Sequence, residues 1–198
     1  CSNVGILARD GNIEGRNVVI NNCGQASLAC TNGGSYDFTH CTFANYWSSP
    51  SQTCLVMDNE DIIVNNINTP TLLTNTNFKN CIFYGSSNLS IKLTKKGGVF
   101  DYNFKNCLIK FVDSNNLINN ELYDFPNNSN YINCIIARNS STNRPDFKDA
   151  RNNELIIGED SAARGSADFT YSTGTSDILN QSRSDPSDMG AYKWTTFD

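Results

Sequence analysis

Five short segments of the chain share one arrangement of apolar and polar positions. Four of them read apolar, any residue, Asn or His, Cys, any residue, apolar, most clearly at residues 78–83 (FKNCIF) and 104–109 (FKNCLI), and the first copy, residues 20–23 (INNC), has the first four positions. The intervals between successive cysteines of these segments are 18, 40, 26 and 27 residues. A specific phrase at unequal intervals indicates one repeated structural unit, with inserted loops of different length.

Each phrase predicts two short strands that meet at a bend. In one copy Phe78 points inward and Lys79 outward, and after the bend Cys81 and Phe83 point inward, so the alternation resumes with shifted parity. Asn suits such a corner because it tolerates the left-handed backbone conformation. Stacked coils then predict a ladder of corner residues whose amides bond from coil to coil, beside a stack of buried thiols. The ladder comprises Asn22, His40, Asn80, Asn106 and Asn133, and the stack comprises Cys23, Cys41, Cys81, Cys107 and Cys134.

The repeat therefore predicts an all-β fold, a right-handed parallel β-helix resembling the pectate-lyase solenoid. A third strand per coil is expected within residues 28–30, 54–57 and 89–93, and the Asn-rich stretches at 115–116 and 127–128 are expected to be loops. Residues 1–145 are expected to form the coils, and residues 146–198 the closing coil and C-terminal cap. Tyr192 and Trp194 are expected to cover the last coil, and Arg183 is expected to pair with Asp188 there.

Composition narrows the class of protein. A net charge of −5 without a Lys/Arg cluster argues against a nucleic-acid partner. No apolar run approaches the ~18 residues of a membrane span. Eight cysteines are about 4% of the chain, below the roughly 8–10% of disulfide scaffolds. Reduced structural thiols are therefore favoured, and a disulfide involving Cys1, Cys30 or Cys54 is the alternative.

Several segments resemble secreted and surface β-helix proteins of Bacteroidetes-type bacteria. They are residues 5–14, 22–25 and 33–47, together with the tail RSDPSDMGAY at 183–192, which is similar to that family's Asp-Ile-Gly-Ala-Tyr closing motif. The resemblance implies an extracellular or outer-membrane-surface location, often as a lipoprotein. It also implies that these residues are the C-terminal part of a longer chain, with further coils before Cys1. The alternative is that Cys1 itself is a lipidated first residue.

Catalytic and metal-binding candidates are few. Enzymes with this fold need carboxylates on adjacent coils, to hold Ca²⁺ or to act as acid and base. Here Asp58, Glu60 and Asp61 lie in one loop, which is either a Ca²⁺ site or a solvated turn. No other cofactor is expected. His40 is expected to be structural, because only Asp37 lies close enough in the sequence to orient it.

Glycan-binding candidates are an aromatic pair and a basic pair. Tyr46 and Trp47 follow a strand, where exposed rings could stack on sugars or cover the core instead. Lys79 and Lys105 stand at the same phase one repeat apart, as a basic stripe for an acidic glycan or as solubilising charges. Asp160-Ser161-Ala162 resembles the O-glycosylation triplet of Bacteroidetes envelope proteins, with a tight turn as the alternative.

The resulting hypothesis is a non-catalytic surface or secreted module, part of a larger assembly, that binds a glycan or an envelope protein. The bare first coil would abut further coils or that partner. The alternative is a polysaccharide lyase or glycoside hydrolase whose active coils lie upstream. The enzyme would be marked by an outward ladder of Asp, Lys or Arg on adjacent coils, which this chain does not present convincingly.

Overall fold

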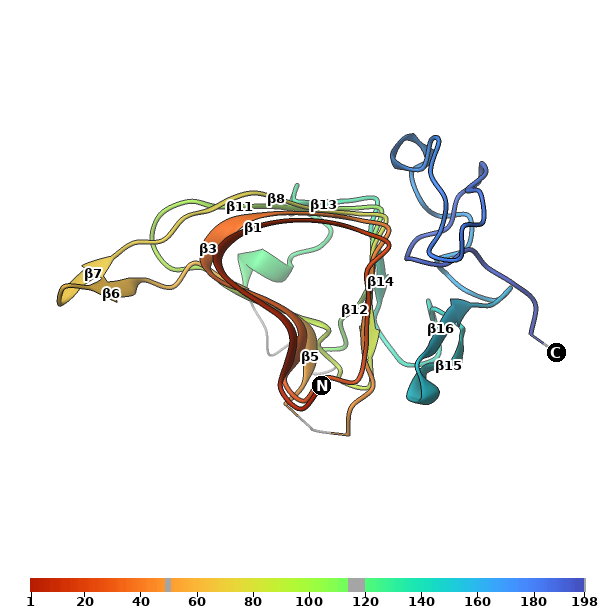
Figure 1. Ribbon diagram of the computed structural model, residues 1–198, viewed down its shortest axis with the longest axis horizontal. Coiled ribbons are helices and arrows are strands. Elements are labelled where there is room, and N and C mark those ends of the chain that lie inside the picture. The colour runs from red at the N-terminus through yellow and green to blue at the C-terminus, as the bar shows by residue number, and fades with distance from the viewer. Residues whose placement is uncertain (49–50, 114–119, 198) are drawn as a thin grey trace.

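The computed structural model describes residues 1–48, 51–113 and 120–197. Within these residues the protein consists mainly of parallel strands in two sheets, with only short 3-10 helices. The larger sheet curls around the core and the smaller sheet lies across the open side of that curl (Figure 1). The chain alternates between the two sheets, and successive strands of each sheet lie side by side in parallel, so that one passage through both sheets is one coil.

The larger sheet contains β1 (Val4–Arg16), β3 (Ala26–Thr39), β5 (Thr53–Asp58), β8 (Leu73–Lys79), β10 (Ile91–Thr94), β11 (Phe100–Lys105) and β13 (Tyr131–Ile132). The smaller sheet contains β2 (Val19–Ile20), β4 (Thr42–Asn45), β9 (Ile82–Gly85), β12 (Leu108–Lys110) and β14 (Ile135–Ala137). Two antiparallel pairs are β6 (Ile62–Val64) with β7 (Ile67–Thr69), which projects from the coils, and β15 (Phe147–Asp149) with β16 (Glu154–Ile157) (Figure 1). The 3-10 helices are η1 (Glu121–Tyr123), η2 (Ala150–Asn152) and η3 (Phe169–Tyr171).

Equivalent residues of successive repeats lie side by side. Phe38 pairs with Phe78, and Phe78 with Phe104, in the larger sheet. Thr42, Ile82 and Leu108 are neighbours in the same way in the smaller sheet. The expected third strand is also present, because the first half of β3 pairs with β5 and β5 pairs with β10. The parallel stacking predicted from the repeat is therefore confirmed.

The bend between the two sheets has the same backbone conformation in every coil. The residue before each repeat cysteine has a φ between 50° and 54°, in the left-handed region; these residues are Asn22, His40, Asn80, Asn106 and Asn133. They are the five positions at which the sequence predicts the corner. A β-branched or bulky residue there would be strained, whereas Asn and His reach this region more readily.

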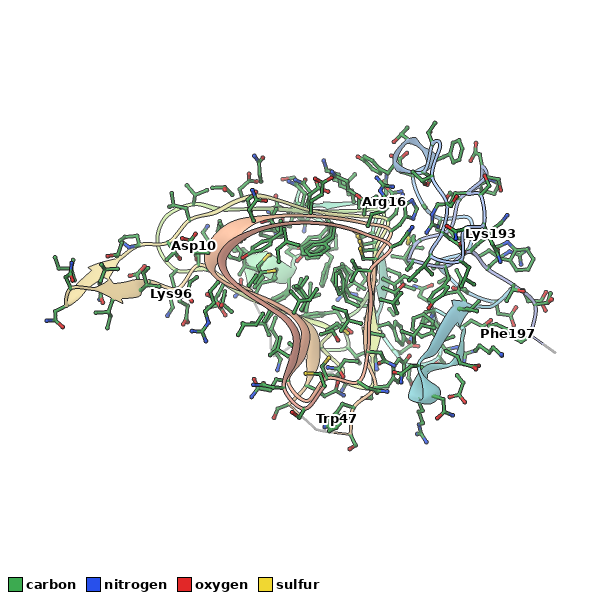
Figure 2. The ribbon with its side chains drawn as sticks, viewed as in Figure 1. Asp10, Arg16, Trp47, Lys96, Lys193 and Phe197 are labelled. Carbon is green, nitrogen blue, oxygen red and sulfur yellow. The ribbon has the colours of Figure 1, made fainter. Side chains whose placement is uncertain are left out.

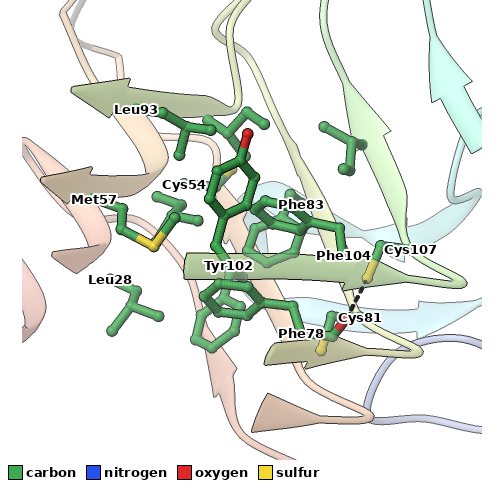
Figure 3. Close-up of a cluster of buried hydrophobic side chains, with 14 of the residues drawn as sticks. Leu28, Cys54, Met57, Phe78, Cys81, Phe83, Leu93, Tyr102, Phe104 and Cys107 are labelled. Carbon is green, nitrogen blue, oxygen red and sulfur yellow. Dashed lines mark hydrogen bonds between the residues drawn. The ribbon is translucent and has the colours of Figure 1, made fainter. Parts of the chain in front are cut away.

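Aromatic rings fill the core immediately before and after the bend. Phe78 stacks on Phe38 and on Phe104, with ring centroids 5.7 and 5.0 Å apart, and Phe104 stacks on Tyr131 at 5.2 Å. Phe83, after the bend, meets Phe78 and Phe104 edge to face (Figure 3). Such pairs contribute about 0.5–1.5 kcal/mol each beyond the area that they bury. The column therefore links successive coils more strongly than backbone pairing alone.

The repeat cysteines line the corner of this core. The thiol of Cys81 donates to the main-chain oxygen of Phe38 at 3.4 Å, and that of Cys107 donates to the main-chain oxygen of Phe78 at 3.3 Å (Figure 3). Each thiol thus contacts the coil before its own. All eight cysteines lie within the described residues and are free thiols, including Cys1, Cys30 and Cys54, for which a disulfide was the alternative.

The end of the stack formed by the last coil is closed by residues 121–125. Leu122, Tyr123 and Phe125 pack with Phe111 against the main core. The Tyr131 hydroxyl donates to the Leu122 carbonyl at 2.8 Å, which ties this plug to the last coil. Residues 127–128 follow this plug outside any helix or strand, as expected, and residues 115–116 lie outside the described residues.

The C-terminal segment from residue 146 onward does not close the last coil, and that expectation is wrong. It lies along the outer face of the smaller sheet (Figure 1), where the Gly190 N–H donates to the Asn80 carbonyl at 2.7 Å. The physical reason is that this outer face is apolar. Ile82 and Leu108 point away from the main core and are buried in a second core with Ile157 and Met189.

The aromatic and charged residues of this segment serve the second core. Trp194 packs against it, and the Arg164 guanidinium lies 3.7 Å from the centre of the indole ring. Arg183 contacts the main-chain oxygen of Asp188, whereas the carboxylate of Asp188 accepts N–H groups of Gly165 and Trp194. The expected ion pair between Arg183 and Asp188 is therefore replaced by bonds to the main chain.

We predict that Phe104→Ala lowers the free energy of unfolding by about 3–5 kcal/mol, because it removes a buried ring from the middle of the column. The matched control is Asn103→Ala, which alters the neighbouring outward position of β11. Urea unfolding followed by circular dichroism measures both variants. A loss for Phe104→Ala no larger than that of the control would contradict the role of the column.

The thiols provide a second test of the packing. In the native protein, peptide mapping after a brief maleimide pulse should find rapid labelling at the exposed Cys1, because the others are buried or partly buried. Unfolding in denaturant without reductant should make all eight cysteines reactive. Fewer than eight adducts in that sample would reveal a disulfide and contradict the free-thiol structure.

Candidate functional sites

The first coil leaves one edge of the larger sheet open. Among the described residues β1 pairs with β3 on one side and with no strand on the other. Its inward side chains, such as Ile6 and Ile13, are only partly buried, whereas the equivalent Leu28 and Tyr36 of the next coil are fully buried. The open edge therefore combines unpaired main-chain groups with partly exposed core.

The predicted basic pair is brought together but is not free. Lys79 and Lys105 are register neighbours on the outer face of the larger sheet. The Lys79 ammonium lies 2.6 Å from the Asp37 carboxylate and 5.7 Å from the centre of the Tyr171 ring. Lys79 is thus compensated by a carboxylate of the preceding coil, which weakens the basic stripe as a glycan site.

The acidic loop at residues 58–61 is stabilised by the carboxylate of its first residue, Asp58. Asp58 is buried, and its carboxylate accepts the N–H groups of Asn32 at 2.8 Å and Glu60 at 3.1 Å. The side chain of Glu60 lies 3.9 Å from Lys96, and Asp61 is exposed. In the described part of the chain no three His, Cys, Asp or Glu side chains converge as metal ligands. The bonding accounts for Asp58 as a structural residue.

The corner residues of the early coils bond mainly to the C-terminal segment and less from coil to coil. One coil-to-coil bond joins Asn80 Nδ2 to His40 Nε2 at 3.1 Å. The Asn80 amide also exchanges two bonds with the main chain of Asp168, and Asn22 donates to Asn153 Oδ1 at 2.9 Å. No amide ladder bond joins Asn106 or Asn133 to a neighbouring coil within the described residues. The continuous amide ladder is therefore not found, because the corner amides of the early coils face the C-terminal segment.

His40 occupies a buried polar cluster between the corner and the C-terminal segment. Its Nε2 lies 2.8 Å from the Ser172 hydroxyl, which donates to the Ser187 hydroxyl at 2.9 Å. Burial, together with the positive charges of Arg183 and Arg16, lowers the pKa of His40 to about 3. The imidazole is thus neutral near pH 7 and is enclosed, which suits a structural role.

The aromatic pair divides between two surroundings. Tyr46 packs edge to face on Phe147 beside the second core, and burial raises the pKa of its hydroxyl. Trp47 is 41% exposed and lies outside the coils (Figure 2). It borders a groove of about 570 Å³ lined by Trp47, Ser48, Gln52, Ser86, Ser87, Asn88, Leu89 and Lys92.

A second hollow of about 390 Å³ shares the lining residue Ser86 with this groove. Its lining includes Tyr46, Tyr84, Lys110 and Arg144. Sequence reasoning missed Lys110, Arg144 and Gln52. A signal existed for Lys110: its register neighbour in β14 is Ala137, so a charged residue there interrupts an otherwise apolar row.

Ser161 is unsuited to carry a glycan. Ser161 is buried, with 7% of its surface exposed, and its hydroxyl accepts a hydrogen bond from the Ala163 N–H at 3.1 Å. A sugar attached there would have to displace the turn. The tight-turn alternative is the one that the structure supports.

His40 should make stability depend on pH. Its folded pKa lies below its unfolded value of about 6.5, so the unfolded chain takes up a proton that the folded chain does not, and stability falls as pH drops from about 6.5 toward 3. Between pH 7 and pH 5 we expect the wild type to lose about 2 kcal/mol more than His40→Asn. Urea unfolding at both pH values measures the difference, and equal losses in the two proteins would contradict the buried neutral imidazole.

Comparisons with family models, with curated proteins and with solved structures found no match to this chain. Within the described residues, no helix has the length and apolar character needed to cross a membrane. The sites above, and not a relative, therefore have to carry the functional conclusion.

Proposed function

We propose that this chain is a non-catalytic module of right-handed parallel β-helix architecture whose first coil accepts a further coil from a larger assembly. The observation that carries the proposal is the difference between the two ends of the stack. The last coil is plugged by residues 121–125, whereas β1 keeps one unpaired edge beside partly exposed core residues.

An exposed strand edge of this length is costly to leave uncovered. β1 spans 13 residues, and an unpaired edge presents a row of N–H and C=O groups that recruits another strand. β1 also carries Leu7, which is 53% exposed. Proteins usually protect such edges with charges, bulges or covering segments, and at the other end of this stack a covering segment is present.

The occupant that fits best is another parallel coil. β1 pairs with β3 in parallel register at both its first and second halves, so a preceding coil could repeat the same geometry. It would bury Ile6 and Ile13 as completely as the equivalent Leu28 and Tyr36 of β3 are buried. This coil would belong either to a longer form of the same chain or to an envelope protein with the same architecture.

The absence of a visible reaction centre in the described coils supports a binding role. His40 is enclosed, Asp58 braces its own loop and Lys79 is paired with Asp37. The resemblance to Bacteroidetes-type surface proteins supports an extracellular or outer-membrane-surface location for the module. Of the two binding roles expected from the sequence, the open edge favours the protein partner.

Hydrogen exchange of the β1 amides tests the proposal. In purified residues 1–198 the β1 amides should exchange faster than those of β3, and in the complete native gene product or its isolated assembly they should become as slow as those of β3. The amides of β12 and β14, away from the open edge, serve as the internal control. Slow β1 exchange in the isolated monomer would overturn the proposal, and protection that grows with protein concentration would assign the edge to a second copy.

A further inference from the structure

We infer that the groove beside Trp47 is a binding site for a linear saccharide that carries negative charge, as carboxylate or sulfate. This site is independent of the open edge of β1. The groove, of about 570 Å³, shares the lining residue Ser86 with the hollow of about 390 Å³, so a linear ligand that passes Ser86 would contact both.

Trp47 provides an aromatic platform that is held in place. The main-chain N–H of Trp47 donates to Asn45 Oδ1 at 3.3 Å, and its main-chain carbonyl accepts a hydrogen bond from the Gln52 side-chain amide at 2.8 Å. Gln52 also donates to the Ser86 hydroxyl, so the main chain around the ring is braced from both sides. The indole itself is 41% exposed, which leaves it accessible to the apolar face of a sugar ring.

The walls of the groove offer hydrogen-bonding groups suited to hydroxyls. Ser86, Ser87 and Asn88 line the groove together with Trp47. Gln52 is 1% exposed, and its Oε1 has no hydrogen-bond partner within the described residues. An unpaired buried acceptor is costly, and a sugar hydroxyl is the type of donor that would satisfy it.

The charge along the groove favours an anion. Lys92 is exposed and donates to the Ser51 carbonyl at 3.1 Å, and Lys110 donates to the Gly85 carbonyl at 2.7 Å. Neither these lysines nor Arg144 takes part in an ion pair within the described part of the chain.

Lys110 is the most informative of these cations. It is buried, contacts the face of Tyr84 at 5.4 Å, and has its pKa lowered by burial. Asp146 lines the same hollow, and its carboxylate, which accepts the Asp160 N–H at 3.2 Å, offsets one of the two positive charges of Lys110 and Arg144. With Lys92 added, three cations and one carboxylate line the groove and the hollow, so an acidic sugar would meet a net positive charge on a chain whose net charge is −5.

Titration calorimetry on residues 1–198 tests the site with a galacturonate hexamer, a heparin hexasaccharide and neutral cellohexaose. The two acidic probes separate carboxylate from sulfate recognition. We expect at least one acidic probe to bind, with an affinity that falls as salt is added, and cellohexaose to bind at least about tenfold more weakly.

Variants locate the binding. Trp47→Ala should weaken binding by about tenfold or more, as expected for loss of an aromatic anchor. Lys92→Gln should weaken it by about three- to fivefold, as expected for one exposed ion pair. Lys105→Gln is the matched control, because it removes an equal charge from β11, a strand of the same sheet whose Lys105 does not line the groove, and it should change nothing.

Three results would overturn the inference: no binding of either acidic probe, equal binding of cellohexaose, or an equal effect of Lys105→Gln and Lys92→Gln. Thermal unfolding of each variant separates loss of binding from loss of fold. Since the probes bind away from β1, failure here leaves the proposed assembly role intact, and the reverse also holds.

Discussion

The structure depends on the left-handed bend that separates the two parallel sheets. At each of the five corners one residue with positive φ turns the chain, so the residue two positions before it and the cysteine after it both face the core. The corner places Phe38, Phe78 and Phe104 directly above one another, and the ring stacking then holds the coils in register. A slip of one residue would expose these rings and bury the neighbouring polar side chains.

The segments that cover the two sheets and the last coil lie where apolar side chains are not buried by the coils themselves. The outer face of the smaller sheet carries Ile82 and Leu108, and the C-terminal segment covers it as a second core. The last coil is covered by the short plug around Leu122. The first coil is the place where neither kind of cover is present in the described residues. Assembly and ligand binding are therefore expected on different parts of the molecule.

The polar corner residues link these layers. Asn80 bonds to His40 within the coils and to Asp168 in the C-terminal segment, so one amide connects both cores. His40 extends the connection through Ser172 to Ser187. Because this cluster is buried and contains no carboxylate partner for the imidazole, docking of the C-terminal segment is coupled to a neutral histidine.

The sequence by itself determined the strands, their parallel stacking, the positions of the corners and the residues of the inner column. These follow from a local pattern repeated five times, in which each copy specifies its own inward and outward positions. Only the tertiary structure decided where the C-terminal segment lies, what plugs the last coil and which charges remain uncompensated. The place of the C-terminal segment depends on contacts between residues more than 80 positions apart, such as Asn80 with Asp168. The plug and the charge pairing depend on side-chain contacts that no local pattern specifies, such as Tyr131 with Leu122 and Lys79 with Asp37. The residue after a repeat cysteine points outward. Where it is apolar, as at Ile82 and Leu108, the sequence indicates that another segment must cover it but does not indicate which one.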